Sequence, residues 1–207
     1  MKGSRKGPTP PKLLAWLNKA GPDWQPDYPF DSSEVRDEVR SGLLAEQRGL
    51  CVYCGRRLDL ARAGETYHVE HFRPRRHYKP LSTTYANLFL SCGQKDEHGK
   101  PSKTCGAVKA DWFDEDQHVA PDYPQCTHRF RFMLSGKIEP QVADDVGALN
   151  MIKNLRLDHP ELNKDRGDVL MMIDGGDLDE TDFWEPEGRF AQNYAHLVFQ
   201  HLGKLLP

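Results

Sequence analysis

Residues 51–109 read CVYCGRRLDLARAGETYHVEHFRPRRHYKPLSTTYANLFLSCGQKDEHGKPSKTCGAVK, and this stretch decides how the chain folds. Cys51 and Cys54 are separated by two residues, the spacing that lets both thiolates of a knuckle bind one zinc ion. Cys92 and Cys105 could complete a site of four thiolates, and the 12 residues between them indicate an inserted loop. The alternatives are a redox dithiol or unrelated buried thiols, but the thioredoxin-like pattern of a redox motif is absent. We predict a structural zinc ion on these four cysteines and an ordinary core role for Cys126.

Between the two pairs of cysteines lies His68-Val-Glu-His71-Phe-Arg-Pro74, and Tyr85-Ala-Asn87-Leu follows it. With the cysteines before and after them, these elements stand in an order that resembles the zinc-stapled form of the HNH nuclease family. The resemblance implies an α+β fold, in which a ββα-metal core stapled by zinc is flanked by N- and C-terminal helices.

Glu70, His71 and Asn87 would form the catalytic group of such a core. Hydrolysis of a phosphodiester needs an activated water and neutralised phosphate charge, which an imidazole beside a carboxylate-held Mg²⁺ or Mn²⁺ supplies. We predict His71 as the general base and Glu70 as a ligand of the catalytic metal. The family implies that Asn87 orients His71 by a side-chain or backbone hydrogen bond. The alternative is a surface His-Glu pair with an Asn at the end of a strand.

The residue after Cys105 departs from the family pattern. In the family it is His or Asn, the second metal ligand, and a Lys follows three residues later; here it is Gly106, while Lys109 keeps the Lys position. The side chains that could replace the missing ligand are Asp96, His98, Asp111 and His68. Of these we favour Asp111 or His98.

Basic side chains are concentrated in the middle of the chain. The net charge is −3, but residues 1–71 carry +1, residues 72–109 carry +6 and residues 110–207 carry −10. A basic segment of this kind suits local contact with a polyanion, whereas the alternative is a solvated loop. The residues predicted to contact nucleic acid, here called the basic strip, are Arg73, Arg75, Arg76, Lys79, Lys103 and Lys109, with Lys100 beside them.

Hydrophobic spacing and helix-capping patterns divide the chain into three segments. Residues 1–50 are predicted to be helical, with helices over 11–20 and from a capping box at Asp31 to about 49. Residues 51–120 form the nuclease core, with short strands over 67–72 and 85–91 and a helix after Cys105. Residues 121–207 form an acidic helical region, with helices near 142–152, 158–175 and 187–206.

The sequence also resembles a narrower branch of the family, the HNH proteins of retron systems and PtuB, the nuclease subunit of Septu antiphage systems. The resembling pieces are residues 46–54, 70–74, 85–92 and 105–109, with 136–140 and 155–166 fitting its helical tail. This implies a defence nuclease that works with PtuA, an ABC/SMC-like ATPase, or with a retron reverse transcriptase and its RNA/DNA. The acidic region would then dock the ATPase through Phe190, Tyr194 and Leu197, or pack on the core as a cap.

The composition favours a cytoplasmic protein without a membrane partner, because mean hydropathy is −0.72 and no apolar run is long enough to cross a bilayer. We therefore predict a metal-dependent endonuclease that cleaves DNA by default or RNA. The main alternative is a non-catalytic zinc module that binds nucleic acid or a partner protein, with Gly106 marking a lost metal site.

Overall fold

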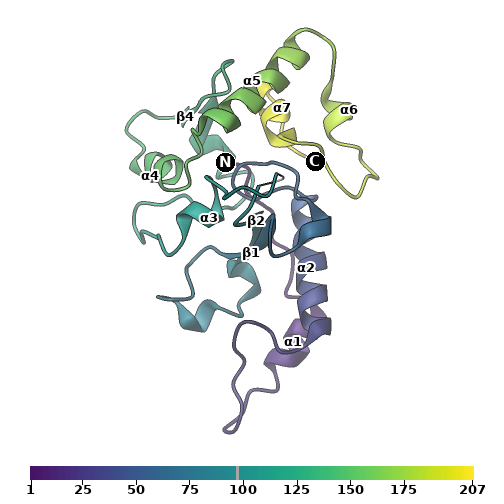
Figure 1. The fold of residues 1–207 in the computed structure, drawn as a ribbon, viewed down its shortest axis with the longest axis vertical. Coiled ribbons are helices and arrows are strands. Elements are labelled where there is room, and N and C mark those ends of the chain that lie inside the picture. Colours follow the sequence, from purple (N-terminus) through teal and green to yellow (C-terminus); the bar gives the residue numbers. More distant parts are fainter. Residues whose placement is uncertain (97) are drawn as a thin grey trace.

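The computed structural model describes residues 1–96 and 98–207 as a mixed α/β protein with two small antiparallel sheets (Figure 1). In chain order the elements are α1 (Pro11–Leu17), α2 (Ser33–Gln47), β1 (Tyr67–His71), β2 (Leu88–Cys92), α3 (Gly106–Lys109), β3 (Phe130–Phe132), β4 (Ile138–Pro140), α4 (Val146–Asn154), α5 (Pro160–Asp174), α6 (Glu180–Phe183) and α7 (Ala195–His201). Figure 1 shows β1, β2 and α3 in the middle of the molecule, with α1 at one end and α4 to α7 gathered at the other. None of the described helices has the length and apolar character needed to cross a membrane.

The central hairpin pairs β1 with β2 in antiparallel register, from Tyr67 opposite Cys92 to His71 opposite Leu88. Because side chains alternate along a strand, His68 and Glu70 point to the same face of the hairpin. α3 covers this face, since Gly106 lies against both side chains. The predicted strand over 67–72 is confirmed. The second strand begins later than predicted, because residues 85–87 form a 3₁₀ turn.

α2 connects the N-terminal segment to the hairpin. It begins after Ser32, whose hydroxyl accepts a hydrogen bond from the N–H of Val35. The predicted cap at Asp31 is therefore wrong by one residue, and Asp31 instead accepts a hydrogen bond from Trp16 Nε1 at 2.7 Å. At the other end, the buried Gln47 amide donates to the carbonyl oxygen of Leu90 and accepts from its N–H, at 2.8 and 2.7 Å. These bonds hold α2 beside β2.

One cluster of buried apolar side chains includes members of all three predicted segments, among them Leu43, Leu90 and Leu197. The cysteine knuckle at residues 51–54 lies between the two ends of the chain. The N–H of Gly3 donates to the carbonyl oxygen of Val52 at 2.8 Å, and the N–H of Tyr194 donates to that of Gly55 at 2.8 Å.

The C-terminal part differs most from the expectation. The helix predicted over 187–206 is the shorter α7, and neither α6 nor the β3–β4 hairpin was predicted. Tyr194 and Leu197 are buried, and Phe190 packs closely against Gly49. Tyr194 and Leu197 are thus packed inside the protein and Phe190 is half-buried, as the predicted cap requires, and docking of the ATPase by the acidic region stays a prediction.

Candidate metal centre and active site

Four cysteines lie together beside the central hairpin. Their sulfur atoms are all within 4.8 Å of one another, and Cys54 Sγ and Cys92 Sγ are 3.7 Å apart. The loop after α2 supplies Cys51 and Cys54, the end of β2 supplies Cys92, and Cys105 directly precedes α3. Four thiolates are the donor set of a structural zinc site. The predicted cluster is therefore confirmed as a group that could bind a metal such as zinc.

The four thiols strongly influence one another's ionisation. The N–H of Arg56 donates to Cys54 Sγ at 3.4 Å, and Ser91 Oγ lies 3.7 Å from Cys51 Sγ. Burial alone would raise the pKa of the Cys51 thiol, but the three neighbouring cysteines hold it well below its ordinary value. The same contacts, with burial, raise the pKa values of Cys92 and Cys105 well above theirs, so the negative charge gathers on Cys51. Cys126 lies outside the cluster and is buried in the core, which matches its predicted role.

A backbone carbonyl fixes the imidazole of His71 at the end of β1. Its Nε2 is 2.9 Å from the carbonyl oxygen of Ser82. Because a carbonyl oxygen can only accept, Nε2 carries the proton and Nδ1 keeps its lone pair. Burial lowers the pKa of His71 to about 4, so the ring is neutral at pH 7. Tyr28 packs edge-on against this ring, with the centroids 4.6 Å apart. His71 can therefore accept a proton at Nδ1.

His71 lines a cleft of about 500 Å³. The loop before α2 contributes one wall through Tyr28, and the segment after β1 contributes another. The charged side chains that line this cleft are Asp27, Glu70, Arg75, Arg76, Lys79 and Asp111. Three members of the basic strip thus share the cleft with His71. Sequence analysis missed Tyr28 and Ser82, because both reach the site through contacts that leave no local spacing pattern.

Acidic side chains pair with much of the basic strip. The closest nitrogen–oxygen distances are 3.3 Å for Arg73–Glu115, 3.3 Å for Arg76–Asp111, 3.6 Å for Lys79–Asp27 and 3.8 Å for Lys103–Glu161. All eight side chains are substantially exposed, and exposed ion pairs contribute little free energy. Such pairs can exchange their carboxylate for a phosphate at small cost.

Asn87 acts on His71 through the intervening loop and not by direct side-chain contact. Its Oδ1 accepts from the N–H of Arg73 at 2.8 Å, and its Nδ2 donates to the carbonyl oxygens of Arg73 and Leu81 at 3.0 and 3.2 Å. Leu81 precedes Ser82, whose carbonyl holds the His71 ring. Asn87 therefore fixes both ends of the loop that positions the imidazole.

Glu70 is buried and has three hydrogen-bond partners. Its Oε1 is 3.0 Å from Tyr53 Oη and 2.9 Å from Lys109 Nζ, and its Oε2 is 3.0 Å from His68 Nε2. Burial alone would raise the pKa of Glu70, but His68 and Lys109 hold it below its ordinary value. Lys109 also donates to the carbonyl oxygen of His71 at 3.2 Å, and its side chain is fully buried. The prediction that Lys109 contacts nucleic acid is therefore wrong, because its ammonium is buried against Glu70 and the carbonyl oxygen of His71 on β1.

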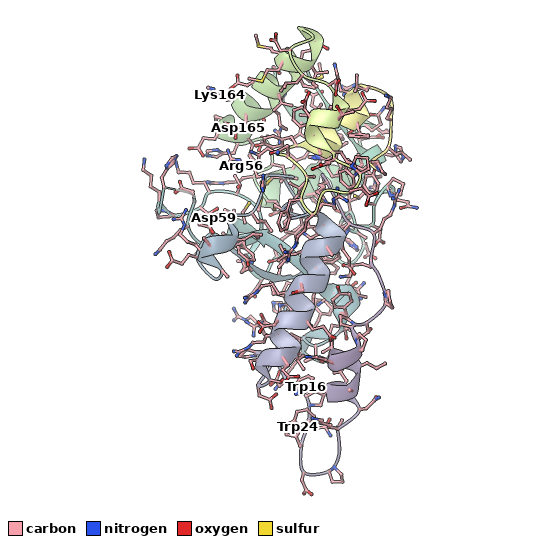
Figure 2. All side chains as sticks on the ribbon, turned by 90° about the vertical axis from the view of Figure 1, so that its right-hand side faces the viewer. Trp16, Trp24, Arg56, Asp59, Lys164 and Asp165 are labelled. Carbon is pink, nitrogen blue, oxygen red and sulfur yellow. The ribbon has the colours of Figure 1, made fainter. Side chains whose placement is uncertain are left out.

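The two favoured replacements for the missing metal ligand lie in different places. Asp111 lines the cleft of His71, where it pairs with Arg76. His98 and Lys103 line a second cleft of about 350 Å³ together with Lys164. Figure 2 labels Lys164 near Arg56, Asp59 and Asp165, which line the same second cleft. The structure therefore does not bring His98 into the cleft of His71 and Glu70.

No family model matches the sequence, and no curated protein matches it either. The resemblance to HNH nucleases and to PtuB stays a prediction. The geometry of His71, Glu70 and the four cysteines is the basis on which a function can be assigned.

Proposed function

We propose that this protein is a metal-dependent endonuclease that hydrolyses phosphodiester bonds of nucleic acid. The observation that carries the proposal is the bond from His71 Nε2 to the Ser82 carbonyl. It leaves Nδ1 of a neutral imidazole free to accept a proton, in a cleft that also contains Arg75, Arg76 and Lys79. A general base beside cationic side chains is the arrangement that hydrolysis of a polyanion requires.

In the proposed reaction, His71 Nδ1 removes a proton from a water molecule while the water oxygen attacks phosphorus. The bond between phosphorus and the leaving sugar oxygen breaks, and that oxygen takes a proton from solvent. Arg75, Arg76 and Lys79 bind the non-bridging phosphate oxygens. The Ser82 carbonyl stabilises the imidazolium by keeping its bond to Nε2–H. Mg²⁺ or Mn²⁺ held at Glu70 supplies charge stabilisation to the phosphate when it is bound.

The four cysteines are proposed to hold a structural zinc ion. Four protein ligands leave no open position for substrate or water, so this metal takes no part in the chemistry. It would join the loop after α2, the end of β2 and the start of α3. The zinc ion thereby keeps α3 aligned with the hairpin that carries Glu70 and His71.

DNA is the proposed substrate, because attack by water needs no 2′-hydroxyl, and RNA is the alternative. Following the resemblance to PtuB and to retron-associated HNH proteins, we propose a cytoplasmic effector nuclease of an antiphage system. Its proposed partner is a PtuA-like ABC/SMC-type ATPase, or in a retron setting a reverse transcriptase with its RNA/DNA.

A non-catalytic zinc module is the second candidate. The observation that favours it is that Glu70 already has three hydrogen-bond partners, among them the Lys109 ammonium. A divalent cation would have to share this carboxylate. In this alternative the basic strip binds nucleic acid or an acidic partner without cutting it.

One experiment separates the two candidates. Plasmid DNA and total RNA are incubated with the zinc-loaded protein and Mg²⁺ or Mn²⁺, with and without a PtuA-like ATPase. His71→Ala should reduce cleavage by about 10²-fold or more through loss of the general base, with zinc content unchanged. His98→Ala, which removes an imidazole from the second cleft, is the matched control and should cut normally. Equal cleavage by wild type and His71→Ala would reject the nuclease assignment.

A further inference from the structure

Gly106 leaves no space for a side chain at the start of α3. A Cβ atom added there would lie 2.6 Å from Oε2 of Glu70, 2.9 Å from Oγ of Ser91 and 3.0 Å from Cε1 of His68. Contacts under 3.0 Å are essentially never seen for a real Cβ, so at least one of these groups would have to move. The His68 ring and the Glu70 carboxylate therefore fill the volume that a side chain on α3 would need.

His68 and Glu70 bring two metal-ligand atoms together. Both side chains leave the same face of β1, and His68 Nε2 lies 3.0 Å from Glu70 Oε2. Neighbouring ligands of an octahedral ion with bonds of about 2.1 Å are about 3.0 Å apart. Mn²⁺ accepts an imidazole nitrogen beside a carboxylate oxygen, whereas Mg²⁺ prefers oxygen ligands and keeps several waters. The His68–Glu70 pair therefore suits Mn²⁺ better than Mg²⁺.

The remaining contacts of Glu70 leave one of its oxygens to His68. Lys109 and Tyr53 both contact Oε1 of Glu70, so His68 is the only hydrogen-bond partner of Oε2 among the described residues. Nδ1 of His68 is buried and has no hydrogen-bond partner in residues 1–96 and 98–207. Most metal-ligating histidines donate their second ring N–H to a carbonyl, a carboxylate or water, so the unpartnered Nδ1 does not distinguish a ligand from a structural histidine. The contact of Nε2 with Glu70 is the observation on which the proposal depends.

We propose that His68 Nε2 and Glu70 Oε2 together bind a divalent cation such as Mn²⁺, and that Gly106 permits this by leaving room for an imidazole from the strand. The use of the cation in catalysis rests on the proposed nuclease function, whereas its binding does not. His68 thus replaces Asp111 and His98 as the second ligand. Among the described residues Glu70 contacts His68 and not Asp111, and His98 lines the second cleft.

The test measures Mn²⁺ binding to the zinc-loaded, full-length protein by electron paramagnetic resonance. Mn²⁺ prefers nitrogen and oxygen ligands, so it leaves the zinc on the four thiolates. Wild type should bind one Mn²⁺ and show imidazole ¹⁴N coupling in the spin-echo modulation. His68→Ala should lose this coupling and raise the Kd for Mn²⁺ about tenfold or more. His98→Ala is the matched control and should behave as wild type.

Moving the imidazole to α3 provides an independent variant. Gly106→His alone should lower Tm, because Glu70, Ser91 and His68 already occupy the space. In His68→Ala/Gly106→His the Glu70 carboxylate and the Ser91 hydroxyl can shift into the volume that His68 leaves, and the ¹⁴N coupling should return. If His68→Ala does not fold, His68→Gln replaces it in the same measurement. Absence of ¹⁴N coupling in wild type, or its persistence without His68, would overturn the proposal.

The two proposals of the site fail in different ways. Imidazole-coupled Mn²⁺ in a protein that cuts neither DNA nor RNA would support this cation site and reject the nuclease. Cleavage that depends on His71, with Mn²⁺ coupling unchanged in His68→Ala, would support the nuclease and reject His68 as a ligand.

Discussion

The ammonium group of Lys109 lies 2.9 Å from Oε1 of Glu70, and both side chains are closed to solvent. Each charge has lost its hydration and depends on the other for compensation. Since Lys109 also bonds the carbonyl oxygen of His71, the pair ties α3 to the strand end that carries both proposed catalytic residues.

We predict that Lys109→Met lowers the free energy of unfolding by about 3–5 kcal/mol, because it leaves the buried Glu70 carboxylate without its cation. Glu70→Gln/Lys109→Met removes both charges and should recover most of this loss. Urea denaturation followed by circular dichroism measures both values. If Lys109→Met were as stable as wild type, the buried Glu70 carboxylate would not need the Lys109 ammonium to compensate its charge.

Loss of one zinc ligand is expected to prevent folding. Metal analysis of the purified protein should give about one zinc per chain, and Cys54→Ser should yield aggregated or unfolded protein. The reason is that metal binding contributes folding free energy on the order of 10 kcal/mol in small zinc modules. Cys126→Ser is the control, because Cys126 is buried outside the cluster. It should retain its zinc, and soluble, monodisperse wild type without zinc would contradict the assignment.

The packing of α7 makes its apolar face essential for stability. Leu197 is 1% exposed, whereas Leu205, just beyond the helix, is 46% exposed. Leu197→Ala should therefore cost about 2–5 kcal/mol of unfolding free energy, and Leu205→Ala less than about 0.5 kcal/mol. Thermal denaturation compares them directly. Equal effects of the two substitutions would mean that Leu197 does not pack in the core.

Asp145 should make the stability of α4 depend on pH. The hydrogen bonds from Arg129 lower the pKa of this carboxyl, which also caps α4 through the N–H of Ala148 at 2.9 Å. The folded pKa of Asp145 lies below the unfolded value of about 3.9. The stabilisation of the folded protein by the ionised carboxylate is therefore complete above pH 5, and it disappears as pH falls through the folded pKa.

Two substitutions at this residue separate the charge from the cap. Asp145→Ala should cost about 1 kcal/mol at pH 7, and Asp145→Asn less, since Asn is also a good N-cap. The difference between wild type and Asp145→Asn should shrink below pH 4 in denaturation curves recorded at several pH values. A constant difference from pH 7 to pH 3 would exclude the Arg129 contact as its source.

Local spacing was sufficient to predict the parts of the site that lie close in sequence. The CxxC knuckle, the β1 strand and the clustering of Cys92 and Cys105 with the knuckle follow from short motifs, and the structure confirms them. The burial of Lys109 could not be predicted, because it depends on how α3 packs against β1. Tyr28 against His71 and α7 against the knuckle are likewise contacts between distant segments. Such contacts are determined by the packing of the whole core and leave no periodic signal.

The lack of room for a side chain at position 106 beside His68 also restricts which substitutions this sequence can accept. A Cβ at position 106 would lie 2.6 Å from Glu70 Oε2 and 3.0 Å from His68 Cε1, so a relative with a side chain there should carry a small residue at position 68 that leaves Glu70 room to shift. In an alignment of relatives the two positions should therefore exchange together, with an imidazole on the strand or on the helix. Relatives could then keep the same divalent-cation site while the imidazole ligand moves from β1 to α3.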